Sequence, residues 1–408
     1  MKYTKGGVTA AKGFKAAGIH AGIKENSPIE KFDVGLLVSD SPCVTACVYT
    51  QNKVKGAPIE ITKLHLEKSG GMSRGVIVNS GNANTCNADG KEKAEEMCSI
   101  AAAALGINPD EMIVASTGVI GQKISIEPVK RVINTLKENL SFEGGNNFTK
   151  AIMTTDTTEK EYAVTFEAGG KTCTIGGTSK GSGMIAPNMA TNLNFLTSDT
   201  AISKEMLKKA LSETVKITYN CLVIDGDTST NDMAAVMCNG LAGNTLIETE
   251  NEDYNQFKEA LTEVMRRLTI MLAKDGEGAT KLLTVNVSGS PDIDTAVEIA
   301  KTVVGSSLLK CAVFGSDANW GRVLCAMGYS KAEFDPNTVD VDFRSKKGII
   351  TLCKNGTGVN FSEEKATEIL SETEIDIDIT LNNGNAKASA YGCDLTYDYV
   401  KINGDYRS

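Results

Sequence analysis

The chain has 408 residues, enough for two domains or for one large domain and a smaller one. Its hydrophobic fraction of 41% can form a sizeable core, and its net charge of −9 includes no basic block, which argues against a nucleic-acid or anionic-membrane surface. No segment reaches the roughly 18 apolar residues of a membrane helix, and the N-terminus lacks the apolar run of a secretory signal, so we expect a cytoplasmic protein.

The first third of the chain alternates between strand and helix patterns. Apolar runs predict strands at 34–40, 44–50 and 74–80. Apolar residues at helical spacing then predict helices at 93–106 and 127–140.

The middle third begins with a hairpin and continues with two long helices. Alternating residues around a Gly-Gly turn predict the hairpin at 161–183. Helical spacing predicts helices at 203–219 and 255–276, and Ser203 is a suitable N-cap for the first of them.

The last third is rich in strands. A strand is predicted at 282–290, a helix followed by a strand within 292–315, and further strands at 339–343, 348–353 and within 374–395.

Adjacent pairs of strands distinguish this pattern from a doubly wound parallel sheet. They favour an α+β fold, a layered αββα-type sandwich of mixed sheets covered by helices, with a smaller C-terminal α/β domain. The long helix ends near Lys281, where a new strand-helix series begins. We therefore expect a catalytic domain over 1–280 and a domain over 281–408 that completes the substrate site.

Histidine and cysteine restrict the chemistry. The only two histidines, His20 and His65, lie in no recognisable motif, so the base of any activated nucleophile is not expected to be a histidine. The 11 cysteines are scattered without a C-x-x-C pair, which predicts reduced thiols and no metal site.

Three short motifs allow both a structural and a functional interpretation. The acidic stretch VIDGDTSTND, residues 223–232, is typical of a turn and lacks the spacing of a calcium loop. KDGEGATK is typical of a helix end, yet its Glu277 lies between two glycines and can meet a cationic substrate. In ASTGVIG, a plain turn by itself, Thr117 offers a hydroxyl and Gly118 a backbone N–H to a developing oxyanion.

The most informative stretch is KGSGMIAPNMATNLNFLTSDT, in which a flexible loop of small residues ends on Thr191 before an alternating strand. A threonine hydroxyl needs a base, and a free α-amine with a pKa of about 7.7–8 would serve. That amine exists only if the bond before Thr191 is cut. The hydroxyl can make the cut by attacking the carbonyl of Ala190, after which water hydrolyses the resulting ester. Local chemistry thus allows a self-cleavage site, although loops of small residues are common.

This stretch closely resembles the processing-site motif of the ornithine acetyltransferase family, the glutamate N-acetyltransferases of arginine biosynthesis. The resemblance continues, in chain order, in NSGNANTC, ASTGVIG, IMTTDT, IDGDTSTND, KDGEGATK, GSDANWGR and NGDYRS. Each motif is weak alone, but together they span nearly the whole chain and are specific.

The resemblance implies self-cleavage into chains 1–190 and 191–408, which stay assembled and pair again as a heterotetramer. It makes Thr191 the nucleophile and, through its α-amine, the base. Thr117 and Gly118 take the family's oxyanion positions. The family's substrate-contact positions fall on Thr154, Lys180, Thr191, Glu277, Asn403 and Ser408.

The mechanism implied is ping-pong transfer of an acetyl group from N2-acetyl-L-ornithine to L-glutamate through an acetyl-threonine, without a cofactor. Some family members also accept acetyl-CoA as a co-substrate, and these residues do not decide that point. Asn192 and Asn194 depart from the apolar residues of many relatives, which puts the polarity of the pocket and the cleavage rate in doubt. Relatives end in Thr or Ser, so with Ser408 as the last residue we expect a complete chain.

Two alternatives remain. A related N-terminal-nucleophile hydrolase, an aminopeptidase or amidase, would share Thr191 and the oxyanion pair but would have no use for Glu277, Asn403 and Ser408. A metabolite-binding protein without catalysis would have no need of Thr191 and its loop. The acceptor of the acyl group, glutamate or water, distinguishes the acetyltransferase from the hydrolase.

Overall fold

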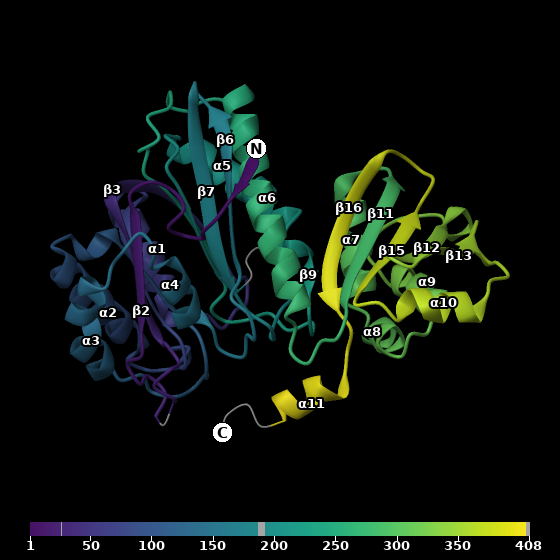
Figure 1. Ribbon diagram of the computed structural model, residues 1–408, viewed down its shortest axis with the longest axis horizontal. Coiled ribbons are helices and arrows are strands. Elements are labelled where there is room, and N and C mark those ends of the chain that lie inside the picture. Colours follow the sequence, from purple (N-terminus) through teal and green to yellow (C-terminus); the bar gives the residue numbers. More distant parts are fainter. Residues whose placement is uncertain (26, 187–191, 405–408) are drawn as a thin grey trace. The chain divides into compact units, whose positions relative to one another are not determined.

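The computed structural model describes residues 1–25, 27–186 and 192–404 (Figure 1). Its contacts divide the chain into two compact units, each discontinuous in sequence. The first unit consists of the described parts of Met1–Gly181, Pro187–Lys216 and Thr228–Leu268. The second consists of the described parts of Ser182–Ala186, Ile217–Asp227 and Thr269–Ser408. The domain boundary expected between residues 280 and 281 stays a prediction.

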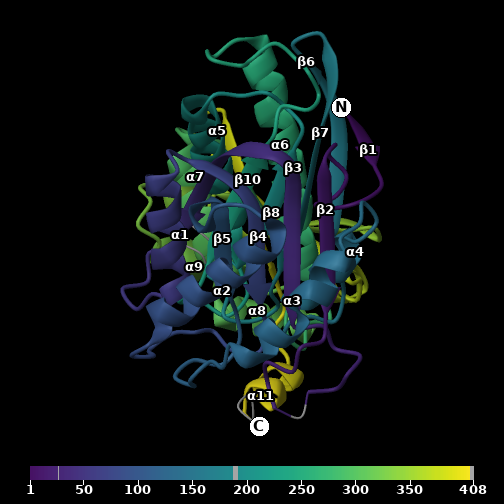
Figure 2. The same ribbon diagram turned by 90° about the vertical axis from the view of Figure 1, so that its left-hand side faces the viewer.

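Within the described residues, the first unit contains a nine-stranded mixed sheet in the order β1-β6-β7-β8-β10-β3-β4-β5, with β2 also paired to β3. Its strands are β1 (Lys2–Thr4), β2 (Phe14–Ile19), β3 (Val34–Tyr49), β4 (Met72–Asn79), β5 (Met112–Ser116), β6 (Glu161–Ala168), β7 (Lys171–Lys180), β8 (Leu193–Ser198) and β10 (Met233–Cys238). Its helices are α1 (Ala57–Lys68), α2 (Gly90–Leu105), the short 3-10 helix η1 (Pro109–Glu111), α3 (Glu127–Glu138), α4 (Gly145–Ile152), α5 (Lys204–Lys216) and most of α6 (Glu252–Lys274). Figure 2 shows α1, α2 and α3 in front of this sheet.

Apolar residues bury both faces of this sheet around β4. Val76 and Val78 lie in one cluster with Phe148, whereas Ile77 lies in a second cluster with Met97. Neighbouring side chains of a strand point to opposite faces, so a strand covered on both sides needs an unbroken apolar run. The run RGVIVNS meets that need.

The second unit contains, within the described residues, a seven-stranded sheet in the order β14-β13-β12-β15-β11-β16-β9. Its strands are β9 (Leu222–Val223), β11 (Leu282–Ser290), β12 (Asp340–Ser345), β13 (Gly348–Lys354), β14 (Thr357–Gly358), β15 (Glu374–Thr380) and β16 (Ala386–Cys393). Its helices are η2 (Tyr219–Cys221), the end of α6, α7 (Ile293–Val304), α8 (Ser307–Phe314), α9 (Trp320–Gly328), η3 (Pro336–Thr338), α10 (Glu363–Leu370) and α11 (Tyr397–Asn403). Its own apolar core contains Val285, Ile299 and Ile377 from β11, α7 and β15.

The predicted α+β class with mixed sheets is confirmed: β8 pairs antiparallel with β7 and parallel with β10. The predicted strands 34–40 and 44–50 form one strand, β3, whose pairing with β4 shifts register between Val38 and Cys43. Ser203 caps α5 as expected, since its Oγ accepts a hydrogen bond from the backbone N–H of Met206 at 3.3 Å.

The strand predicted in the second half of 292–315 is wrong, because Ser307–Phe314 is the helix α8. Ser306 caps it by accepting from Leu309 N–H at 3.3 Å. The buried residues Leu309, Ala312 and Val313 follow the helical spacing i, i+3, i+4. A short apolar run fits the spacing of either a strand or a helix. Here the N-cap serine favours the helix.

Phe148→Ala tests the core beneath the large sheet. Phe148 is fully buried and meets Phe195 edge-on, with 5.4 Å between the ring centroids. We expect the substitution to lower the free energy of unfolding by about 3–5 kcal/mol, because it removes apolar contacts and leaves a cavity. Urea unfolding curves measure the loss. Phe142→Ala, at a ring that is 50% exposed, is the control and should cost about 1 kcal/mol or less; equal losses would contradict the proposed core.

Candidate functional site

The predicted oxyanion residues lie in a loop that begins where β5 ends. The N–H of Thr117 donates to Asn79 O at 3.0 Å, so its hydroxyl is the Thr117 group left to meet a ligand. Gly118 has φ of 128°, and a Cβ there would lie 2.4 Å from the backbone carbon of Gly81. No other residue fits at this position, because the neighbouring loop passes directly against it.

Asn231 fixes this loop from the acidic stretch 223–232. Its Nδ2 donates to Ala83 O at 2.6 Å and to Ser116 O at 2.9 Å. Its Oδ1 accepts from the hydroxyl of Thr85 at 2.7 Å. This buried amide therefore holds the residue that immediately precedes Thr117.

Asp232, the next residue, holds the start of β8. Its Oδ1 accepts from the backbone N–H of Asn192 at 2.7 Å, and Met233 N–H donates to Asn192 O at 2.7 Å. Burial raises the pKa of the Asp232 carboxyl to about 7, although hydrogen bonds from Asn192 and Ser229 and the charge of Lys180 act in the opposite direction. A polar chain thus runs from Ser116 through Asn231 and Asp232 to Asn192, all within the first unit.

The predicted cleavage residues Ala190 and Thr191 lie outside the described residues, so the structure places their neighbour Asn192 but not the residues themselves. Asn192 has φ of 59°, in the left-handed region that asparagine tolerates better than most residues. Asn194 is buried in β8 and accepts from the hydroxyl of Ser179 at 2.6 Å. The side chain of Asn194 thus has a polar partner, whereas Nδ2 of Asn192 is buried without a hydrogen-bond partner among the described residues.

Thr154 and Lys180 are brought together by a residue that was not predicted, Asp156. Its buried carboxylate accepts from Thr154 N–H at 3.0 Å and from Gly181 N–H at 2.6 Å, and pairs with Lys160 at 2.7 Å. Burial alone would raise its pKa, but the charges of Lys180 and Lys160 with these hydrogen bonds hold the pKa at about 2. The carboxylate is therefore a fixed negative charge beside Lys180.

Glu277 and Asn403 meet in the second unit although 126 positions separate them. Asn403 Nδ2 donates to Glu277 Oε2 at 2.6 Å and to Tyr399 O at 3.1 Å. Glu277 is buried, and its backbone N–H donates to Ser182 O at 2.8 Å. The predicted partner Ser408 lies outside the described residues.

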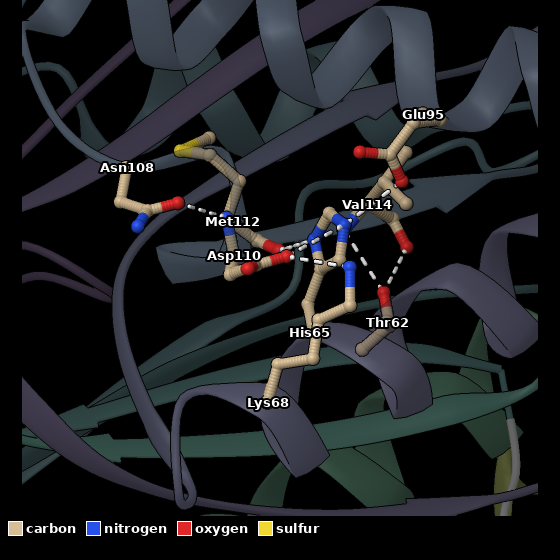
Figure 3. Close-up of polar contacts among 8 residues, drawn as sticks. All are labelled: Thr62, His65, Lys68, Glu95, Asn108, Asp110, Met112 and Val114. Carbon is tan, nitrogen blue, oxygen red and sulfur yellow. Dashed lines mark hydrogen bonds and ion pairs between the residues drawn. The ribbon is translucent and has the colours of Figure 1, made fainter.

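Both histidines bond to residues outside the predicted site set. Figure 3 shows His65 among Met112, Glu95 and Asp110: its Nδ1–H donates to Met112 O at 2.9 Å, and its Nε2 lies 2.9 Å from Glu95 Oε2. The Nδ1 atom of His20 lies 2.8 Å from Lys31 O. His65 is thus a buried connection among α1, β5 and α2, not a base with a free nitrogen.

Among the residues that the structure describes, no group of three or more His, Cys, Asp or Glu side chains is arranged to hold a metal ion. In the same described ranges, no helix combines the length and apolar character needed to cross a membrane.

A model of the ArgJ family matches residues 15–408. The chain belongs to the ArgJ family. It is 48% identical over 402 residues to the arginine biosynthesis bifunctional protein ArgJ 1 of Clostridium acetobutylicum, with 98% of this chain and 97% of that one covered. It is 49% identical over 409 residues to the ArgJ protein of Symbiobacterium thermophilum, with all of both chains covered. The crystal structure of ArgJ from Bacillus halodurans is 44% identical, with a TM-score of 0.49 over 52% of this chain and 98% of that chain.

The family predicted from the motifs is therefore confirmed. So is the enzyme class, since ArgJ proteins are ornithine acetyltransferases and glutamate N-acetyltransferases.

Sequence reasoning missed Asp156, Asn231 and Asp232 as site residues. All three lie in motifs that carry the resemblance to the ArgJ family, IMTTDT and IDGDTSTND. The signal was an aspartate among polar residues in each motif, and residues 223–232 were also typical of a turn. Their burial, which only the tertiary structure provides, gives them their role.

His65→Gln tests the structural role of the buried histidine. We expect the free energy of unfolding to fall by about 1–3 kcal/mol, because buried polar partners lose their hydrogen bonds. Below the unfolding temperature, acetyl transfer should be unchanged. Thermal unfolding and steady-state turnover measure the two effects, and His20→Gln is the control with the smaller stability loss. A folded His65→Gln variant without turnover would instead make the histidine part of catalysis.

Proposed function

We propose that this protein cleaves itself before Thr191 and then transfers the acetyl group of N2-acetyl-L-ornithine to L-glutamate through an ester on Thr191. Membership of the ArgJ family over residues 15–408 supports the proposal, as do relatives named for arginine biosynthesis. The structural observation that carries it is the polar chain in which Asn231 and Asp232 connect Ser116, before Thr117, to Asn192, after Thr191.

In the first step, the Thr191 hydroxyl attacks the carbonyl carbon of Ala190. The carbon–nitrogen bond breaks, and the nitrogen takes the proton from the hydroxyl and becomes the α-amine of Thr191. Water then hydrolyses the ester, which releases the carboxyl group of Ala190 and restores the hydroxyl. The products are the chains 1–190 and 191–408.

In the second step, the free α-amine accepts the hydroxyl proton while Thr191 Oγ attacks the acetyl carbon. The Thr117 hydroxyl and the Gly118 N–H donate to the oxyanion of the tetrahedral intermediate. The amine of ornithine leaves with the proton. The amine of glutamate then attacks the acetyl-threonine, and Thr191 Oγ regains a proton as N-acetylglutamate departs.

The remaining predicted residues bind the substrates. Lys180 suits a substrate carboxylate and Glu277 suits a substrate ammonium, because opposite charges form short, strong hydrogen bonds. Thr154, Asn403 and Ser408 complete the set. The bond from Asn403 to Glu277 supports this assignment, because the amide holds one carboxylate oxygen and orients the other. The reaction needs no cofactor.

Acetyl-CoA is proposed as a second acetyl donor, in keeping with relatives whose names call them bifunctional. The two chains made by self-cleavage are proposed to stay together and to pair again, giving a heterotetramer. A cytoplasmic location accords with the biosynthetic role that the relatives' names state.

Thr191→Ala tests the self-generated nucleophile. We expect wild-type protein to give two chains that divide between Ala190 and Thr191, and the variant to give one whole chain with acetyl transfer lowered at least about 1,000-fold. Intact mass and an assay of acetylornithine with glutamate measure this. A whole chain in active wild-type protein would contradict the use of an α-amine base, and acetate release in preference to N-acetylglutamate would favour a hydrolase.

Glu277→Gln tests the proposed ammonium contact. Glutamine keeps an acceptor for Asn403 but removes the charge, so KM for acetylornithine should rise on the order of 10–100-fold, from a charged hydrogen bond of about 1.5–3 kcal/mol. Stability should change little. Glu363→Gln, at an exposed position in α10, is the control. An unchanged KM would remove Glu277 from the substrate contacts.

A further inference from the structure

The acidic stretch 223–232 has a use that neither the family resemblance nor the proposed transfer reaction assigns. Of its three aspartates, Asp225 lies in the second unit and accepts from Met184 N–H at 2.6 Å and from Ile185 N–H at 2.9 Å. In the same unit Ile224 N–H donates to Ile185 O at 2.8 Å. The stretch therefore holds the chain just before residues 187–191.

Asp232 holds the chain just after those residues, within the first unit. Its carboxyl accepts from Asn192 N–H at 2.7 Å, and this nitrogen is bonded to the carbonyl carbon of Thr191. The strand β10, which follows Asp232, pairs with β8 from Met233 and Leu193 onward. Each end of the acidic stretch thus holds one flank of the expected cleavage site.

The two residues held in this way share an unusual backbone conformation. Met184 has φ of 55° and Asn192 has φ of 59°, in the left-handed region that non-glycine residues seldom adopt. Such a conformation costs free energy and persists only where its surroundings enforce it. In both cases the N–H of the strained residue donates to an aspartate of the stretch.

The donors around Asp232 fit a positioning role. Besides Asn192, the side chain and the backbone N–H of Ser229 donate to this carboxyl. Three donors occupy most of the roughly four acceptor sites of a carboxylate, which suits a group that holds backbone N–H groups in place. Asp225 likewise accepts from several donors, the hydroxyl of Tyr399 at 3.3 Å among them.

We propose that the acidic stretch 223–232 is a positioning element for self-cleavage, in which Asp225 fixes the flank before the cut and Asp232 the flank after it. The inference rests on the proposed self-cleavage at Thr191. Each flank is held, within its own unit, in a conformation that a free chain seldom samples. Holding reactants near the attack geometry is worth orders of magnitude in rate.

The experiment compares alanine with asparagine at each aspartate. The full chain is made in a cell-free translation reaction, and conversion of the whole chain to two chains is followed by intact mass. Asp225→Ala and Asp232→Ala should slow cleavage by roughly 10–100-fold, since small misplacements of reacting groups cost about that much. Asp232→Asn should stay within about threefold of wild type, because the amide oxygen can still accept from Asn192 N–H. Asp225→Asn should fall between wild type and alanine, because Met184 and Ile185 donate to different oxygens of Asp225 and the amide keeps only one of these acceptors.

Two matched controls separate positioning from general loss of stability. Asp227→Ala removes the third acid of the same stretch, at an exposed position. Asp199→Ala removes a buried carboxylate at the other end of β8, where it accepts from Thr174 N–H at 2.7 Å. Both controls should cleave at the wild-type rate. If Asp232→Ala does not fold, as thermal unfolding will show, the half-buried Asp225 pair decides the outcome.

Cleavage of both alanine variants at the wild-type rate would overturn the proposal. An Asp232→Asn variant as slow as Asp232→Ala would overturn it too, because the carboxylate would then act through its charge or as a base. If cleavage of the Asp199→Ala control is slow as well, loss of stability explains the slower cleavage, and this result counts against positioning. If the wild-type chain is cut before Thr191 and the variants are cut at the same rate, only this inference is refuted. If the wild-type chain stays whole, the proposed self-cleavage is refuted as well.

Discussion

The loops of this protein depend on aspartate carboxylates that accept hydrogen bonds from backbone N–H groups. Asp33 accepts from three consecutive residues, Ala21 to Ile23, at 2.5–2.9 Å. Asp394 accepts from Thr280 and Lys281 at 2.8 and 3.0 Å. Loop N–H groups have no partner in a helix or a sheet ladder, and an unpaired buried donor costs about 1–3 kcal/mol. A carboxylate can accept several such donors at once, and they in turn offset the cost of burying its charge.

Aspartate carboxylates also hold the strand β8, which begins just after the expected cleavage site. β8 lies inside the sheet, with β7 on one side and β10 on the other, so its backbone is bonded along both edges. Its start is held by Asp232 and its end by Asp199, which accepts from Thr174 N–H. A strand held along its whole length keeps its place when the chain is cut just before it. This arrangement makes a cut before Thr191 compatible with an intact first unit.

The sequence was sufficient for what depends on local pattern. Adjacent strand pairs predicted mixed sheets, and the N-cap of α5 at Ser203 followed from residue type alone. The helix α8 was missed because its apolar run fits either periodicity over so short a length. The motifs predict Gly118 as a site residue, but its need for glycine comes from the loop at Gly81, which no local pattern reveals. Asn231 likewise acts through residues more than 100 positions away.

Capping of the helix α11 brings Glu277 and Asn403 together, although the two residues lie far apart in the sequence. The hydroxyl of Thr396 donates to Gly278 O at 2.7 Å and accepts from Tyr399 N–H at 3.4 Å as the N-cap of α11. The loop that carries Glu277 and the start of α11 therefore share one side chain. Gly278 has φ of 67°, and a Cβ there would lie 2.6 Å from the backbone nitrogen of Tyr399, so only glycine lets the helix start this close. Asn403 then projects from the last turn of a short helix whose position the Glu277 loop has already fixed. Gly278, one of the glycines that make KDGEGATK typical of a helix end, thus lets the glutamate of this motif meet the C-terminal helix.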